Sequence, residues 1–204
     1  MADPLLDDLN DRQRDAVLHE GGPLLVVAGA GSGKTRVLTR RIAHVVRDRK
    51  VPPYQIMAIT FTNKAAAEMR ERVVELVGSR AAAMQVSTFH SACVRILRRE
   101  AHHLDFPSGF SIYDSADSQR LITTISRDLE IVSKRHSARS LASAISNQKN
   151  ELIDAESFAA IAQGPNDKVV SEVYLQYQRL LAQSGALDFD DLIGETVAVL
   201  QAFP

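Results

Sequence analysis

The sequence predicts an α/β protein whose first part is a parallel β-sheet flanked by helices and whose second part is an inserted helical subdomain. Short apolar runs alternate with amphipathic helical segments up to about residue 105, as they do in a parallel sheet with helical crossovers. A glycine-rich segment follows the first apolar run, and beyond residue 105 almost every segment has a helical pattern. We therefore expect an α/β core over residues 1–105 and a helical insertion over residues 106–204, whose last helix leads back to the core.

The beginning of the chain predicts a helix, a buried strand and a second helix. Asn10–His19 has the pattern of a short helix with an Asn N-cap. The run Leu24–Val27 consists of four large apolar residues, which is typical of a strand buried on both faces. Apolar residues recur at helical spacing over Lys34–Asp48, and Pro52-Pro53 ends this part of the pattern.

Two further strand–helix pairs are expected before residue 105. The second strand is Ile56–Thr60, and the helix after it is Asn63–Val77, which is rich in good helix formers and stops at Gly78. The third strand is Met84–Ser87, which leads into a helix over residues 91–101.

The rest of the chain predicts helices, apart from a short extended segment at Phe110–Tyr113. The expected helices are Ala116–Leu129, Ala138–Asn150, Ala155–Ala162, Lys168–Ser184 and Phe189–Ala202. Each is preceded or begun by a residue that commonly caps helices, namely Ser115, Ser137, Asp154, Asp167 and Asp188.

Composition narrows the class of protein. The chain has 204 residues, 45% of them hydrophobic, so it can bury a sizeable core. Its one cysteine, Cys93, excludes an intramolecular disulfide and fits a reducing compartment. No apolar run approaches the roughly 18 residues of a membrane-spanning helix, and we expect a cytoplasmic protein with no membrane partner. Residues 1–100 hold 16 Lys and Arg against 11 Asp and Glu, a basic excess compatible with nucleic acid.

Residues 28–35 have the form of a P-loop, the phosphate-binding loop between a strand and a helix. Glycines let backbone N–H groups turn toward a phosphate, and the N-terminus of the following helix favours the same anion. Lys34 is then expected to contact the β- and γ-phosphates of ATP, and the Thr35 hydroxyl to bind Mg²⁺. The usual first glycine is replaced by Ala28, and the alternative is a glycine-rich turn without a ligand. The expected nucleotide-binding residues of the loop are Ala28, Gly29, Ala30, Gly31, Ser32, Gly33, Lys34 and Thr35.

The chain lacks one component that a P-loop enzyme needs. Hydrolysis requires an acidic residue after another apolar strand to hold Mg²⁺, and no such strand is recognisable here. The pair Asp190-Asp191 has a helical context instead. The sequence therefore reads as a truncated, N-terminal part of a larger protein.

Further motifs resemble one family in order along the chain. The segments are Leu9-Asn10 with Gln13, the P-loop, residues 58–66 (AITFTNKAA), residues 86–90 (VSTFH) and residues 187–192 (LDFDDL). They resemble motifs of bacterial superfamily 1 DNA helicases of the UvrD/PcrA/Rep group. The resemblance implies a RecA-like ATP-binding core over residues 1–105. It also implies an ATP-driven motor that moves 3′ to 5′ along single-stranded DNA and unwinds duplexes.

The resemblance assigns two more residues to the nucleotide. Gln13 matches the glutamine that recognises adenine in the family, and its amide can donate and accept hydrogen bonds at once. Arg36 matches an arginine near the nucleotide, with an ordinary surface arginine as the alternative.

Residues after the second and third strands are expected to contact DNA. Ligands bind at the carboxyl edge of open α/β sheets, where Phe61 is suited to stack on a base, and Thr62 and Asn63 to hold a phosphate. The alternative for Phe61 is a wedge between helix and sheet. Thr88 and His90 follow the next strand and could touch the DNA backbone, although His90 could instead be a capping or core histidine.

Two other places carry weaker expectations. Phe189 resembles a family phenylalanine that contacts a base, with a hydrophobic contact on its own helix as the alternative. The pair His102-His103 reads as exposed helix-end surface rather than as a metal-ligand pair.

Together these residues predict the ATP-binding and partial single-stranded-DNA-binding portion of a 3′–5′ DNA helicase, acting in DNA repair and using ATP and Mg²⁺. We expect the 204 residues alone not to unwind DNA or turn over ATP. Expected partners are single-stranded DNA and single-strand/duplex junctions and, by resemblance, excision-repair proteins or RNA polymerase. The alternatives are a P-loop phosphotransferase and a non-catalytic nucleotide-binding interaction module.

Overall fold

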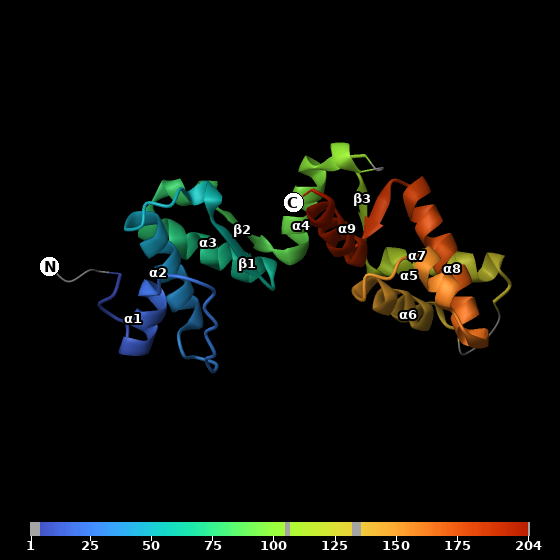
Figure 1. Ribbon diagram of the computed structural model, residues 1–204, viewed down its shortest axis with the longest axis horizontal. Helices are drawn as coiled ribbons and strands as arrows, with labels where there is room; N and C mark the ends of the chain where they lie inside the picture. The colour runs from blue at the N-terminus through green and yellow to red at the C-terminus, as the bar shows by residue number, and fades with distance from the viewer. Residues whose placement is uncertain (1–4, 105–106, 132–135, 204) are drawn as a thin grey trace. The chain divides into compact units, whose positions relative to one another are not determined.

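The computed structural model describes residues 5–104, 107–131 and 136–203. Its contacts divide the chain into a first unit, Met1–Ala92, and a second unit, Cys93–Pro204 (Figure 1). This division falls before the boundary at residue 105 that the change in sequence pattern suggests.

The first unit holds a two-stranded parallel sheet with helices on it. β1 pairs with β2 in parallel, from Met57 opposite Gln85 to Thr60 opposite Thr88, so both strands end at the same edge. The sequence predicted both strands to within one residue at each end. The elements are α1 (Asp11–Leu18), α2 (Lys34–Arg47), η1 (Pro53–Gln55), β1 (Met57–Thr60), α3 (Asn63–Val77), η2 (Ser79–Ala83), β2 (Gln85–Thr88) and the start of α4 (Phe89–Arg99).

The core of the first unit fixes α2 and α3 against the sheet. Ile42 and Val46 of α2 are buried in one cluster with Met69 and Val73 of α3 and with Val86 of β2. Burial of each such side chain is worth about 1.5–3 kcal/mol. The packing therefore holds the N-termini of α2 and α3 in place, and both helices begin directly after a segment that the sequence assigned to a ligand.

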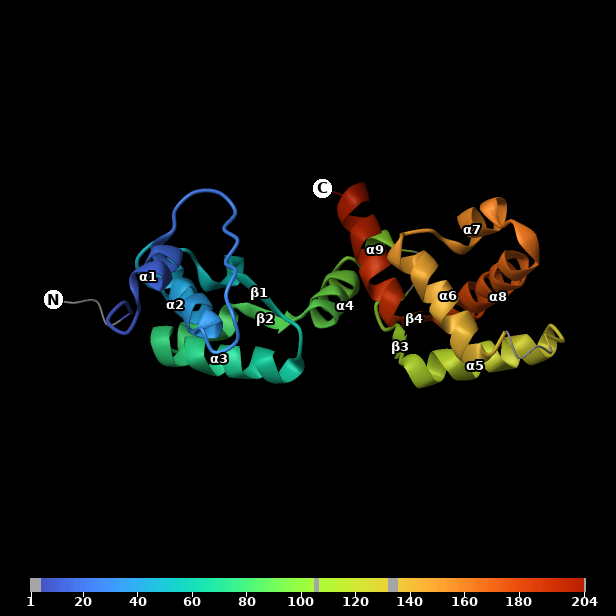
Figure 2. The ribbon, with the colours of Figure 1, turned by 90° about the horizontal axis from the view of Figure 1, so that it is seen from below.

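The expected buried strand at Leu24–Val27 is not formed. These residues pair with no other strand of the described chain, and Leu25 and Val27 are 86% and 89% exposed. Figure 2 shows them within an open loop between α1 and α2. A strand needs a neighbour to pair its backbone, and among the described residues β1 and β2 pair only with each other. The prediction of a strand at this position is wrong for this structure.

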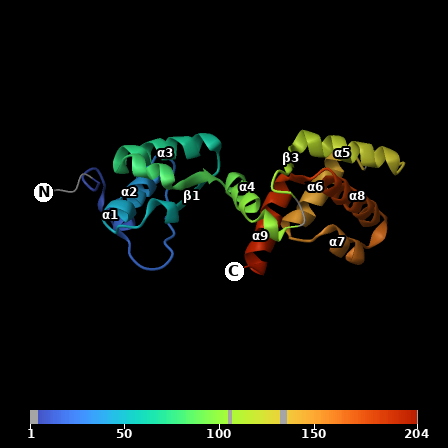
Figure 3. The same cartoon turned by 90° about the horizontal axis from the view of Figure 1, so that it is seen from above.

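The second unit is mainly helical. Figures 2 and 3 show α6 and α8 lying between α5 and α7. A core that includes Ile122, Leu141, Ile145, Tyr174 and Tyr177 joins α5, α6 and α8. The elements after α4 are η3 (Ala101–His103), β3 (Ser111–Tyr113), α5 (Ser115–Asp128), α6 (Ala138–Asn150), α7 (Ala155–Ile161), α8 (Gly164–Gln183), β4 (Ala186–Asp188) and α9 (Phe189–Ala202).

The second unit holds a short parallel sheet besides its helices, so it is not all-helical. The extended segment that the sequence predicted at Phe110–Tyr113 is confirmed as β3, whereas β4 was not predicted. β3 pairs in parallel with β4, from Ser111 opposite Ala186 to Tyr113 opposite Asp188. β4 was not predicted because its three residues are too few to show the alternation of apolar and polar residues that is typical of a strand. Its last residue, Asp188, is also the predicted N-cap of α9, and that cap is confirmed.

Two expected helix caps are also corrected. Asp114, not Ser115, caps α5, because its carboxylate accepts hydrogen bonds from the backbone N–H groups of Ala116 and Asp117. α8 begins at Gly164 rather than Lys168, with Gln163 instead of Asp167 as its N-cap, because Pro165 suits the first helical turn. The predicted caps Ser137 and Asp154 are confirmed.

Candidate functional site

The glycine-rich loop leads directly into α2. Gly31 and Gly33 have φ angles of 74° and 85°, the left-handed region that favours glycine. A Cβ atom on Gly33 would lie 3.0 Å from the Gln13 side-chain nitrogen, so the Gln13 amide would have to give way by a few tenths of an ångström. Gly33 also N-caps α2 without a side chain, so the first backbone N–H groups of α2 face no capping group of their own.

The Lys34 side chain folds back over the loop. Its ammonium group donates hydrogen bonds to the carbonyl oxygens of Ala28, at 2.9 Å, and Gly29, at 2.6 Å. The Ser32 hydroxyl donates to the same Gly29 oxygen at 2.7 Å. Thr35 is exposed in the first turn of α2. The Lys34 ammonium, the Thr35 hydroxyl and the N-terminus of α2 thus lie within consecutive residues, a donor set that suits a phosphate with a bound Mg²⁺.

The structure brings Gln13 against this loop. The Gln13 amide nitrogen donates to the Ser32 carbonyl at 2.9 Å, and its amide oxygen accepts from the Asn10 backbone N–H at 3.1 Å. The second bond belongs to a capping box with the predicted N-cap Asn10, whose side chain accepts from the Gln13 N–H. Arg36 lies on α2 nearby and donates to the Asp8 carbonyl at 3.4 Å. Two residues that the sequence assigned to the nucleotide are therefore neighbours of the loop in this structure.

Aromatic side chains follow both strands of the first sheet. Thr60 and Thr88 are register partners at the ends of β1 and β2, and the next residues are Phe61 and Phe89. Phe61 is 94% exposed, so it does not act as a wedge between α3 and the sheet. Phe89 is 61% exposed. Sequence reasoning missed Phe89 as a candidate, although the repeated Thr-Phe after two strands was the signal that could have found it.

The polar residues at this edge mostly support the backbone. Thr62 N-caps α3 by accepting a hydrogen bond from the Ala65 N–H at 3.1 Å, while Asn63 is exposed in the first turn. Thr88 is buried, and its hydroxyl lies 2.9 Å from that of Ser91 in α4. His90 is exposed at the beginning of α4. The helix N-terminus at Thr62 is thus more open to a ligand than the Thr88 hydroxyl.

Phe189 belongs to the second unit, at the first position of α9. It is 42% exposed and lines a hollow of about 310 Å³ together with Tyr113, Arg139, Ser143 and Ser146. The carboxylates of Asp114, Asp188 and Asp190 line the same hollow, so its charge is mixed. Of the lining groups, the aromatic ring, the guanidinium and the two hydroxyls are of the kinds that contact single-stranded nucleic acid.

A buried charge network lies beside Phe189, and sequence reasoning missed it. The Lys149 ammonium is 2.6 Å from Asp188 and 2.7 Å from Asp191, and all three side chains are less than 10% exposed. Burial acts to raise the pKa of Asp188, but the charge and hydrogen bond of Lys149 outweigh it and lower that pKa. Burial raises the pKa of Asp191 despite Lys149. The pKa of Glu195 is also raised, by burial first and by Asp191 second.

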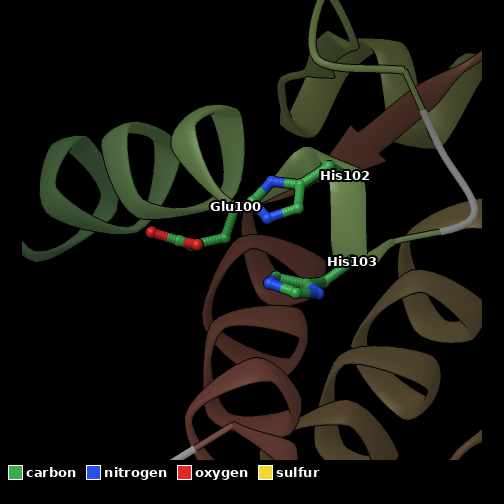
Figure 4. Close-up of side chains that lie close together, drawn as sticks. All are labelled: Glu100, His102 and His103. Carbon is green, nitrogen blue, oxygen red and sulfur yellow. The ribbon is translucent and has the colours of Figure 1, made fainter.

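Glu100, His102 and His103 present ligand-type atoms within 4.8 Å of one another (Figure 4). Two of these groups already have partners, since Arg99 lies 2.9 Å from the Glu100 carboxylate and Phe203 stacks on the His103 ring at 4.1 Å. Both histidines are exposed, as the sequence led us to expect, and we assign no metal to the group.

Comparison with known proteins identifies relatives along the whole chain. Residues 9–204 match the family described as UvrD/REP helicase N-terminal domain. The chain is 62% identical over 207 aligned positions to the ATP-dependent DNA helicase UvrD1 of Mycobacterium tuberculosis, covering 100% of this chain and 27% of that protein. It is 47% identical over 204 positions to the ATP-dependent DNA helicase PcrA of Bacillus subtilis, covering 100% of this chain and 28% of that protein. The chain thus spans little more than a quarter of the length of these relatives. In the part of the chain that the structure describes, no helix is long and apolar enough to cross a membrane.

Proposed function

The chain belongs to the UvrD/REP helicase family, as its N-terminal domain, and on this premise we propose that it is the ATP-binding and partial single-stranded-DNA-binding part of a 3′–5′ DNA helicase that acts in DNA repair. The observation that carries the proposal is the loop of residues 28–35, which has left-handed glycines at 31 and 33, leads directly into α2 at Lys34 and accepts a hydrogen bond from Gln13 at Ser32.

Lys34 and Thr35 serve the triphosphate in this proposal. The Lys34 ammonium exchanges its bonds to the Ala28 and Gly29 carbonyls for bonds to phosphate oxygens, which are stronger because both partners are charged. The Thr35 hydroxyl holds Mg²⁺, which neutralises charge on the phosphates. Gln13 turns its amide from Ser32 to the edge of adenine, the group that its double hydrogen-bonding capacity fits.

Single-stranded DNA lies along the carboxyl edge of β1 and β2 in this proposal. Phe61 stacks on a base, and the exposed residues Thr62 and Asn63 at the N-terminus of α3 receive a phosphate. Within the second unit, taken by itself, Phe189 contacts a base at the hollow that Arg139 also lines. Single-strand/duplex junctions are the substrates of the whole helicase, and protein partners such as excision-repair proteins or RNA polymerase follow from the resemblance alone.

The 204 residues by themselves are proposed to bind nucleotide without turning it over. Hydrolysis needs a carboxylate at a strand end next to the P-loop, to hold Mg²⁺ and orient water. Within the described residues of the first unit, β1 and β2 are followed by Phe61 and Phe89 rather than by an acidic residue. A multi-turnover ATPase in the purified chain would contradict this part of the proposal.

A titration with a fluorescent ATP analogue, with and without Mg²⁺, tests the nucleotide site. We expect Lys34→Ala to weaken binding about 10-fold or more, because charge-assisted hydrogen bonds contribute about 1.5–3 kcal/mol. Lys168→Ala removes an exposed lysine of the second unit and is the matched control, with unchanged affinity. Equal affinity in both variants would remove Lys34 from the site and with it the main support for the proposal.

A further inference from the structure

Lys149 is a buried cation that has no part in the proposed nucleotide or DNA contacts. Besides Asp188 and Asp191, its ammonium faces the ring of Tyr177 at 5.0 Å and that of Tyr174 at 6.0 Å. The Tyr177 hydroxyl donates to Asp188 at 2.9 Å and also lies 2.8 Å from the Ser118 hydroxyl. The cluster therefore ties together α5, α6, α8, β4 and the start of α9.

Each carboxylate of the cluster uses its two oxygens for different tasks. One oxygen of Asp188 accepts the Asp191 N–H at 2.8 Å, and one oxygen of Asp191 accepts the Asp188 N–H at 3.2 Å, which closes a capping box around residues 188–191. The other oxygen of each carboxylate accepts from Lys149. Phe189 is inside this box, so the backbone that carries its ring is held from both sides.

This box differs from the others in the chain. The capping box of Asp114 and Asp117 consists of exposed hydrogen bonds. Two carboxylates buried without a cation would instead be strongly unfavourable, and a cap alone needs neither the burial nor the cation. The burial of Asp188 and Asp191 beside Lys149 is therefore not explained by the capping of α9 alone.

The position of Lys149 on α6 supplies a further reason. Arg139, Ser143 and Ser146 of the same helix line the hollow that Phe189 also lines. Lys149 bonds to Asp188 and Asp191, so it links this wall of the hollow to the backbone that carries the Phe189 ring.

We propose that Lys149 is a positioning residue, which holds the Asp188–Asp191 box so that Phe189 and the α6 wall face one nucleotide of single-stranded DNA. The inference rests on the proposed DNA contact of Phe189. Lys149 itself touches no DNA, and its contribution to DNA affinity passes through the Phe189 ring.

A double-mutant cycle on the 204-residue chain tests the coupling. One arm of the cycle is the double substitution Lys149→Met with Asp191→Asn, here called the Lys149 change. It removes one positive and one negative charge, so the net charge of the cluster stays the same. The amide oxygen of the asparagine at position 191 can still accept the hydrogen bond that closes the box. We expect this pair to weaken binding of fluorescein-labelled oligo(dT) to a similar extent as Phe189→Ala, and to have no further effect when Phe189→Ala is present. Independent, multiplying losses in proteins with a native melting transition would overturn the positioning role, and so would an unchanged affinity after the Lys149 change.

A second readout does not depend on DNA. The sequence contains no Trp, so Phe189→Trp introduces a single fluorescent reporter at the ring position. With the Lys149 change added, we expect acrylamide to quench this fluorescence more strongly and its anisotropy to fall, because the ring is no longer held. Unchanged quenching and anisotropy would overturn the inference. If the fluorescence changes but Phe189→Ala binds DNA normally, only the DNA contact of Phe189 is overturned, and with it the DNA role of Lys149.

Discussion

Phe61 provides the sharpest test at the scale of single residues. Its ring is 94% exposed at the carboxyl end of β1, where base stacking would contribute about 1–3 kcal/mol. We expect Phe61→Ala to weaken oligo(dT) binding about 5- to 150-fold in fluorescence anisotropy at constant salt concentration. The matched control is Tyr54→Ala, since Tyr54 is 65% exposed in η1 before β1, at the opposite edge of the sheet. An equal loss of oligo(dT) affinity in both variants would mean that Phe61 makes no specific contact with DNA.

Gly33 tests the loop itself. A side chain there would have to adopt a φ of 85° and would meet the Gln13 side chain at 3.0 Å. We expect Gly33→Ala to lower the free energy of unfolding by about 1–3 kcal/mol, the cost of strained backbone, and to abolish binding of the fluorescent ATP analogue. In the control Gly22→Ala the new methyl group meets no atom within 4 Å, and Tm should be unchanged. A Gly33→Ala protein with native Tm would show that the loop relaxes.

At the scale of elements, the N-caps of α5 and α7 predict acid lability of the second unit. Hydrogen bonds from backbone N–H groups, of Asp117 and Ala116 in one case and of Ser157 in the other, lower the pKa of Asp114 and Asp154 below the ordinary 3.8. A lowered folded-state pKa stabilises the fold above the unfolded value, and this stabilisation disappears as the pH falls below about 3.8.

Replacement of both caps by asparagine isolates this effect. Asn keeps a capping oxygen but does not titrate, so Asp114→Asn with Asp154→Asn should flatten the decrease of Tm between pH 5 and pH 3. Asp128→Asn removes an exposed carboxylate from the last turn of α5, at the end opposite to its N-cap, and is the control. If Tm falls with pH equally in the double asparagine variant and in the Asp128→Asn control, the assignment of acid lability to the caps is contradicted.

Local signals explain which elements could be predicted. Asn63–Val77 was predicted with both ends correct because strong helix formers fill the segment and Gly78 follows it directly. The prediction of a strand at Leu24–Val27 was wrong because a strand depends on a partner elsewhere in the chain, which a local sequence pattern does not show. The same limit applies to the sites. Lys34 stands in a contiguous motif, whereas Lys149 meets its partners across 39 and 42 residues of sequence.

At the scale of the whole molecule, the open apolar loop predicts how the chain behaves in isolation. Leu25 and Val27 are 86% and 89% exposed, and an exposed extended apolar segment pairs readily with another chain. We expect the 204-residue chain to bind the dye ANS and to self-associate with rising concentration in light scattering, and Leu25→Lys with Val27→Lys to reduce both signals. Ile161→Lys, at a position 59% exposed in the second unit, should leave both signals as they are. If the double lysine variant associates as strongly as the unmodified chain, another surface is responsible, and the loop is better shielded in solution than its exposure in the structure implies.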